Sequence, residues 1–139
     1  MGATRVVGAL IAESLANLEP ALTMPQWRVL VLANEENCNV SAVAGDLKVH
    51  MSNATRICDR LVAAGLLERR RAEYDRRHVL LVLTAAGRDL FESAMDYRRR
   101  RIEVAMALMG QNERAALATA SSLFVEAATQ ARMTVRSQG

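Results

Sequence analysis

The sequence of 139 residues has few of the residue types that mark several classes of protein. Its two cysteines are too few for a disulfide framework, and its two histidines show no spacing typical of a zinc site. With only two prolines and seven glycines against 51% hydrophobic residues, the chain is not a disordered one. No apolar run is long enough to span a membrane, and the first twelve residues lack the features of a signal peptide. We expect a helix-rich cytoplasmic protein without a metal, a cofactor or a membrane partner.

The residue patterns that catalysis requires are also missing. The sequence shows no pair of carboxylates on a shared face, no nucleophile with a plausible base, and no glycine-rich phosphate loop. We therefore predict that the protein is not an enzyme.

Positive charge is concentrated in the middle of the chain. The net charge of the whole chain is only +3, which does not by itself indicate nucleic-acid binding. From Lys48 to Arg77, however, eight basic residues stand against four acidic ones, a net charge of +4 that leaves −1 for the rest of the chain. This basic segment is the first place to look for a contact with DNA.

Helical spacing of apolar residues predicts most of the secondary structure. A first helix is expected over residues 6–18. A second begins at Thr23, because Thr23 and Gln26 have the spacing of a capping box. Near the end of the chain, a long helix capped by Thr84 and a last helix after Gly110 each carry an apolar stripe.

Two shorter helices in between have the pattern of a helix-turn-helix. Asn39 is a suitable N-cap for a helix of about two turns that ends before a turn at residues 48–50. The next helix begins near Met51, and Gly65 is its expected left-handed C-cap. The apolar positions of this second helix lie on one face, so its polar residues are exposed. A short helix, a tight turn and a polar-faced second helix are typical of DNA-binding proteins.

A β-hairpin is predicted directly after these helices. Residues 66–71 and 78–83 have strand-like patterns and are joined by a polar connection. We therefore expect a mostly α fold with a small β-hairpin, which is a winged helix-turn-helix with N- and C-terminal dimerisation helices. Residues 23–84 form the DNA-binding lobe in this prediction, and residues 1–22 and 85–139 form the dimerisation region.

Four ordered segments of the chain resemble the MarR family of bacterial transcription regulators. They are LTMPQWRVL (22–30), NVSAVAGDLKVHMSNATRICDRL (39–61), GLLERR (65–70) and DRRHVLLVLTAAG (75–87). At the predicted DNA end the chain departs from the family pattern, because Lys48 stands where a glycine is common and His50-Met51 where Ser-Pro often opens the recognition helix. We expect these differences to change the operator and not the fold.

The predicted recognition helix carries groups that can read base edges in the major groove. Four polar residues stand at its start: Ser52, Asn53, Thr55 and Arg56. Asn53 is suited to pair with adenine and Arg56 with guanine. Arg60, one turn further on, is expected to contact phosphate, and so is Arg70 in the first strand.

The connection of the hairpin carries a second group of expected contacts. Arg76 and Arg77 follow Asp75, and a guanidinium suits the negative potential of a narrow minor groove. The family resemblance implies that Arg77 is the inserted residue, and that Asp75 orients it or braces the loop.

The first helix and the last two carry more apolar surface than a lobe of this size can cover. We therefore predict a two-fold homodimer built from residues near 5–18 and 100–130. Its recognition helices would meet half-sites about one DNA turn apart, roughly 34–36 Å, in a near-palindromic operator. The four arginines at 98–101 point to all sides of a helix, so they are interpreted as solvated or ion-paired.

The resemblance further implies a small-molecule effector, often aromatic or phenolic, that binds between the dimer helices and the DNA-binding lobe and releases the DNA. The candidate pocket residues are Met24, Trp27 and Arg28, although Trp27 is interpreted first as a packing residue.

The predicted function is therefore that of a sequence-specific regulator of double-stranded DNA, with repression as the expected mode. Two alternatives stay open. One is a winged-helix module for protein contact, and the other is a redox-switched regulator that uses Cys38 or Cys58.

Overall fold

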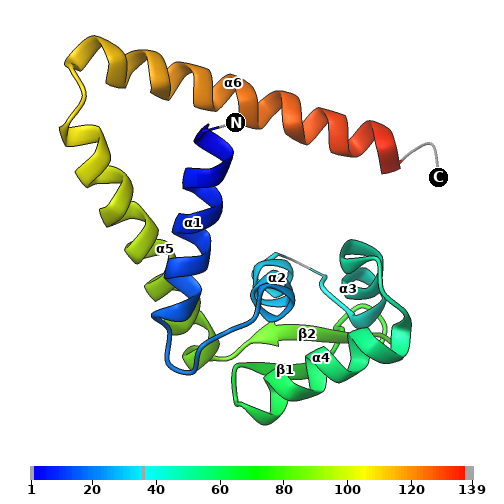
Figure 1. Cartoon of the computed structure of the whole chain (residues 1–139). Coiled ribbons are helices and arrows are strands. Elements are labelled where there is room, and N and C mark those ends of the chain that lie inside the picture. Colours follow the sequence, from blue (N-terminus) through cyan, green and yellow to red (C-terminus); the bar gives the residue numbers. More distant parts are fainter. Residues whose placement is uncertain (1, 36, 137–139) are drawn as a thin grey trace. The chain divides into compact units, whose positions relative to one another are not determined.

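The computed structural model of the protein describes residues 2–35 and 37–136. Within them, six α-helices and one two-stranded antiparallel hairpin follow one another, and the hairpin lies between the fourth and fifth helices (Figure 1). The prediction of a mostly helical fold with a small β-hairpin is confirmed. The chain forms two compact units, of which the first ends at Arg99 and the second begins at Arg100. In the described ranges no helix is both long and apolar enough to cross a membrane.

The first two helices are α1 (Gly2–Ala16) and α2 (Met24–Ala33). α1 begins about one turn earlier than predicted, because residues 2–5 hold no large apolar side chain to reveal the helical period. The capping box of α2 is present as predicted. The Gln26 N–H donates to Thr23 Oγ1 at 3.3 Å, and the Thr23 N–H donates to Gln26 Oε1 at 2.9 Å.

α3 (Val40–Leu47) and α4 (Met51–Ala63) form the predicted helix-turn-helix. Asn39 caps α3, since its Oδ1 accepts the Ala42 N–H at 2.9 Å. The chain leaves α4 through Gly65, whose φ of 73° is the left-handed conformation expected of a C-terminal glycine. The predicted apolar face of α4 is buried, and its fully buried residues recur at three- and four-residue intervals: Ala54, Cys58 and Leu61.

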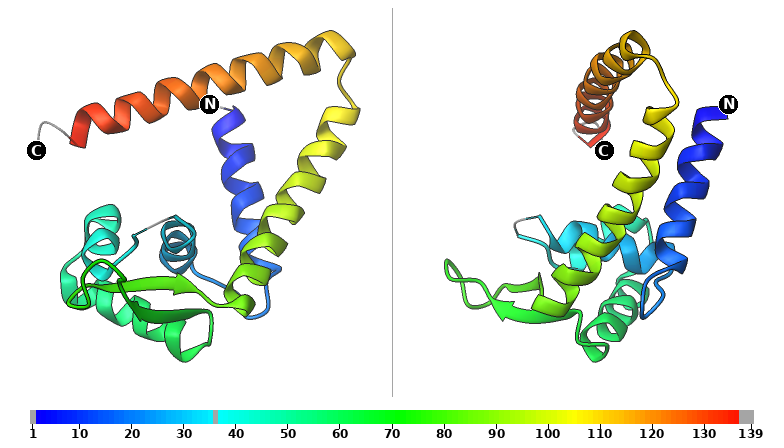
Figure 2. Two further views of the ribbon diagram at one scale, coloured as in Figure 1. Left: turned by 180° about the vertical axis from the view of Figure 1, so that it is seen from behind. Right: turned by 90° about the vertical axis from the view of Figure 1, so that its left-hand side faces the viewer.

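The hairpin consists of β1 (Leu67–Arg71) and β2 (Val79–Leu83), which pair with the first residue of β1 opposite the last residue of β2. The Leu81 N–H donates to the Cys38 carbonyl at 2.8 Å and so joins β2 to the loop before α3. Figure 2 shows the connection between the strands projecting away from the helices, as a wing does.

α5 (Ala85–Ala107) begins directly after β2, and Thr84 caps it as predicted. The Gly87 N–H donates to Thr84 Oγ1 at 3.0 Å, while the Thr84 hydroxyl donates to the Gly65 carbonyl at 2.6 Å. A Cβ on Gly87 would lie 2.0 Å from the carbonyl oxygen of Leu66. The close approach of α5 to the start of the hairpin therefore requires a glycine at this position.

Buried side chains of the first unit form one apolar cluster, to which both strands and every helix of this unit contribute. Representative members are Leu15, Leu30, Val43, Leu61, Leu67, Leu83 and Leu90. Because α4 and the hairpin each bury one face in this cluster, their polar faces are held toward solvent.

α6 (Gln111–Arg136) lies in the second unit. Large apolar residues of this helix are exposed in the single chain, among them Leu117, Leu123 and Phe124, which is 73% exposed. Apolar surface of this kind is typical of an interaction face.

Candidate nucleic-acid interface

The exposed face of α4 carries the predicted base-reading residues. Ser52, Asn53 and Arg56 are exposed, and so is Arg60 one turn further along. In the described part of the chain neither arginine has an ion pair. Their guanidinium groups are therefore available to an external partner.

Thr55 differs from the other residues of this face. It is half-buried, and its hydroxyl donates to the Met51 carbonyl at 2.9 Å. A hydroxyl has one donor, so the remaining lone pairs of Thr55 can only accept a hydrogen bond. Its capacity to discriminate among bases is smaller than that of Asn53, which keeps both a donor and an acceptor.

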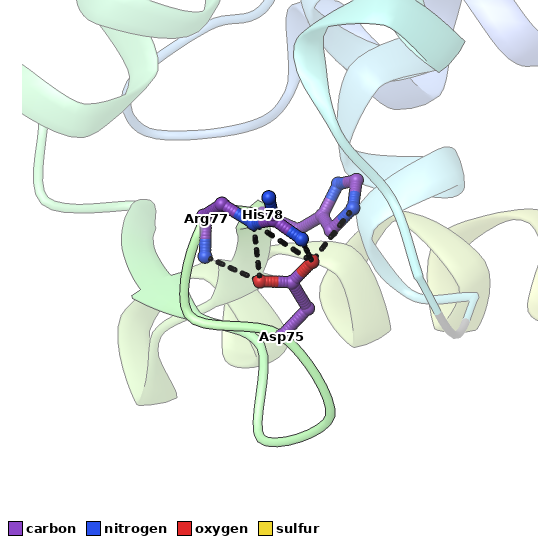
Figure 3. A network of polar contacts seen from close by, with 3 residues as sticks. All are labelled: Asp75, Arg77 and His78. Carbon is purple, nitrogen blue, oxygen red and sulfur yellow. Dashed lines mark hydrogen bonds and ion pairs between the residues drawn. The ribbon is translucent and has the colours of Figure 1, made fainter.

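The hairpin connection holds Arg77 by a compact set of contacts with Asp75 (Figure 3). The backbone N–H of Arg77 donates to Asp75 Oδ1 at 3.0 Å, and its Nε donates to the same oxygen at 3.2 Å. The Nη2 of Arg77 donates to Asp75 Oδ2 at 3.1 Å, although 90% of the Arg77 side chain is exposed. The hydrogen bonds from Arg77 hold the pKa of the Asp75 carboxyl below its ordinary value.

His78 adds an imidazole to this group. Its Nε2 lies 3.6 Å from Asp75 Oδ2, and its ring lies 5.9 Å from the ring of Tyr74. Arg76, by contrast, is exposed and has no ion pair among the described residues. The connection therefore presents one braced arginine and one unpaired arginine.

The three arginines of β1 have different surroundings. Arg69 pairs with Asp59 of α4 at 2.6 Å, which links the hairpin to that helix. Arg70, predicted to contact phosphate, forms an ion pair with Glu68. Arg71 is exposed and has no ion pair in the part of the chain that the structure describes. Because exposed pairs contribute little, Arg70 can exchange Glu68 for a phosphate.

Trp27 is buried as predicted for a packing residue. Its ring stacks on Phe91 with centroids 5.0 Å apart and an angle of 10° between the planes. The Cζ atom of Arg98 lies 4.4 Å from the centroid of the Trp27 ring, a cation–π contact.

The interpretation of Arg98 as a solvated or ion-paired residue is wrong. Its Nε donates to the hydroxyl of the fully buried Ser14 at 2.8 Å, and its Nη2 is buried with no hydrogen-bond partner among the described residues. Burial lowers the pKa of this guanidinium. The sequence contained a signal for this position, because Arg98 follows the buried residues Leu90 and Ala94 at intervals of four on α5. Arg99, its neighbour, pairs with Asp96 at 2.8 Å as predicted.

The other two candidate pocket residues have different environments. Met24 is exposed. Arg28 is engaged inside the fold, because its Nε and Nη2 donate to the two carboxylate oxygens of Asp46 at 2.6 and 2.8 Å. This bidentate pair joins α2 to α3, and spacing along the chain gave no signal for it.

A cavity of about 380 Å³ lies beside β2. It is lined by the end of α2, by Asn37, by residues 80–83 and by Arg88. None of the three candidate pocket residues lines it.

Both cysteines are buried free thiols. Burial raises the pKa of Cys38 to about 11 and also raises that of Cys58. Because the thiolate is the reactive form, these values do not favour a redox role. Among the described residues no group of three or more His, Cys, Asp or Glu side chains could hold a metal ion.

Comparisons with known proteins agree with this geometry. Residues 22–79 match the model of the MarR family. The chain is 29% identical to the uncharacterized HTH-type transcriptional regulator YfiV of Bacillus subtilis over 112 residues, which cover 80% of this chain and 70% of the relative.

Solved structures share the fold over most of the chain. The crystal structure of RV1404 from Mycobacterium tuberculosis has 36% identity and a TM-score of 0.81, covering 92% of this chain and 88% of its own. CouR from Rhodococcus jostii, solved with bound p-coumaroyl-CoA, has 24% identity and a TM-score of 0.59, covering 84% of both chains.

Proposed function

Because the chain belongs to the MarR family of transcription regulators and has the DNA-binding winged helix-turn-helix fold, we propose that it is a homodimeric repressor of a near-palindromic operator. The protein is thus a regulator and not an enzyme. The observation that carries the proposal is the polar face of α4, which the buried face of the same helix holds toward solvent beside a wing that carries two arginines. A DNA-binding regulator works beside the chromosome, so the cytoplasm is part of the proposal.

The proposal gives each element of the interface its own role. Ser52, Asn53 and Arg56 read bases in the major groove, with Thr55 as an acceptor. Phosphates are bound by Arg60 and Arg70, and these contacts set register without reading sequence. Arg77, held by Asp75, enters the minor groove while Arg76 contacts the adjacent backbone.

Dimerisation is supported by the apolar surface that a single chain leaves exposed. On α1 the exposed residues Val6 and Val7 belong to this surface, and on α6 Leu117, Leu123 and Phe124 do. A second copy of the chain would cover them by a two-fold interface. In this proposal residues 1–22 and 85–139 form the dimerisation region, and residues 23–84 form the DNA-binding lobe.

The effector is proposed to bind beside Trp27. Arg98 supports this place, because its buried Nη2 lacks an acceptor and its guanidinium already lies against the aromatic ring. An aromatic ligand with an anionic or carbonyl oxygen would supply that acceptor. The ligand releases DNA if it binds the DNA-incompetent state more tightly.

Fluorescence anisotropy tests the proposal directly. The protein is titrated against a duplex from the region upstream of its own gene and against a scrambled duplex, at two salt concentrations. We expect tight, salt-dependent binding to the first duplex and binding weaker by a factor of roughly 10³ or more to the second. Arg77→Ala should lose affinity, whereas Arg88→Ala removes the same charge at the start of α5 and serves as the matched control.

The rival function is a winged-helix module for protein contact. It predicts weak binding to both duplexes, with Arg77→Ala indistinguishable from Arg88→Ala.

A further inference from the structure

Lys48 ends α3 in a backbone conformation that lysine rarely adopts. Its φ of 54° and ψ of 46° lie in the left-handed region, where Cβ approaches the following carbonyl oxygen. Two other described residues have a positive φ, Asn37 and Gly65, and both are of types that tolerate it. Lys48 is therefore the residue whose side chain does not suit its backbone.

The capping bonds of this turn do not involve the lysine side chain. They come from the backbone, since the N–H groups of Lys48 and Val49 both donate to the Ala44 carbonyl. A glycine would make the same two bonds without the steric conflict. The turn needs a left-handed residue but does not need a lysine, so the strain of placing lysine there is a reason to look for a function.

The ammonium group of Lys48 is exposed and, in the described ranges, has neither a hydrogen bond nor an ion pair. The acidic residue closest in sequence, Asp46, accepts hydrogen bonds from Nε and Nη2 of Arg28. Lys48 therefore presents a positive charge in the turn that leads directly into α4.

We propose that Lys48 is a DNA-backbone contact, whose ammonium binds a phosphate at the edge of the groove that α4 enters. The lysine gains affinity for DNA at a position where glycine would give a more stable fold. This inference rests on the proposed function, because it requires α4 to approach DNA. As a phosphate contact, Lys48 contributes affinity and register but no sequence discrimination.

Lys48→Gly tests the inference because stability and DNA affinity should change in opposite directions. Thermal unfolding should show a higher Tm, since the left-handed strain is removed. Each lost phosphate contact should reduce the slope of log affinity against log salt concentration by about 0.9, and should weaken DNA binding roughly tenfold at 0.1 M salt. A dimer carries two copies of Lys48, so the variant should lose two such contacts. The loss should be the same on a duplex that the wild-type protein selects from a random pool and on its scrambled version.

Asn37→Gly is the matched control. It replaces a left-handed residue in the loop before α3, with a φ of 63°, and should leave both Tm and DNA affinity close to the wild-type values, because asparagine already tolerates this conformation. Lys48→Arg keeps both the charge and the strain, so its affinity should stay within about twofold of wild type.

The inference is overturned if Lys48→Gly binds both duplexes with the wild-type affinity and salt slope while the wild-type protein still prefers the selected duplex. A wild-type protein that selects no duplex would overturn the proposed function, and this inference with it.

Discussion

At the residue scale, the contact between Asp75 and Arg77 decides how the wing presents its arginine. Three nitrogen-to-oxygen contacts of 3.1–3.3 Å hold a side chain that is otherwise exposed. A guanidinium that is held before binding loses less conformational entropy when it enters a groove. In the proposed function, this brace positions Arg77 for the minor groove before DNA binds.

The hydrogen bonds between Arg77 and Asp75 predict how the stability of the protein depends on pH. Asp75 has a lowered pKa in the folded state, so its contribution to stability is present above the unfolded-state pKa and is lost as pH falls through the folded-state pKa. Arg77→Ala should raise the pKa of Asp75 back toward its ordinary value, because Arg77 donates the bonds that lower it. A carboxyl-carbon NMR titration of both proteins measures the change, and an unaltered titration of Asp75 would show that another group causes the shift.

A second residue-scale prediction concerns Arg98. Trp27 is the single tryptophan of the chain, so its fluorescence reports directly on the ring that Arg98 covers. We expect benzoate to cause a saturable change in emission in the wild type, and benzamide to bind at least about tenfold more weakly because it lacks the charge. Arg98→Gln should abolish the benzoate response.

Arg99→Gln is the control for this experiment, since Arg99 is the exposed neighbour that pairs with Asp96. If Arg98→Gln responds to benzoate as Arg99→Gln does, the effector site does not involve Arg98. That outcome would not contradict the proposed DNA binding, which does not depend on Arg98.

At the element scale, alanine substitutions at two helical glycines have opposite predicted effects on the free energy of unfolding. Gly87→Ala places a Cβ 2.0 Å from the Leu66 carbonyl oxygen and should lower the free energy of unfolding by about 1–3 kcal/mol or more. Gly45→Ala, inside α3 with open space around the new methyl, should raise it by roughly 0.5–1 kcal/mol. Urea unfolding of the two variants measures both values, and equal changes would contradict the packing of α5 against the start of the hairpin.

Local chemistry explains why most of the elements could be predicted from the sequence. The caps at Thr23, Asn39 and Thr84 are bonds between residues three apart, and the left-handed Gly65 follows from the end of a helical stripe. The start of α1 could not be predicted, because its first turn has no apolar period.

Long-range contacts were beyond what spacing along the chain could predict. The pairing of Arg28 with Asp46 joins residues eighteen apart, and that of Arg98 with Ser14 joins residues eighty-four apart. The candidate DNA-reading residues, by contrast, required only the period of α4. The exception is Thr55, whose bond to the backbone of its own helix is not visible in a periodic pattern.

At the scale of the whole molecule, the exposed apolar face of α6 predicts the oligomeric state. Phe124→Glu places a charge on the stripe that a second copy would cover, so it should shift the protein toward monomers and reduce DNA affinity. Ser122→Glu, on the opposite face of α6, is the matched control and should remain dimeric. Sedimentation velocity at micromolar concentration measures the outcome, and a monomeric wild type or a dimeric Phe124→Glu would contradict the proposed interface.

Selection of binding sites from a pool of random duplexes tests the central claim most directly, because it examines sequence reading and two-fold symmetry in one experiment. A homodimer with two copies of α4 should enrich an inverted repeat whose half-sites are centred about one helical turn, roughly 10–10.5 base pairs, apart. Arg56→Ala should relax the preference within each half-site and leave the spacing unchanged. Enrichment of a single unrepeated half-site would contradict the dimer, and a pool without any enriched motif would contradict the proposal that this protein reads DNA sequence.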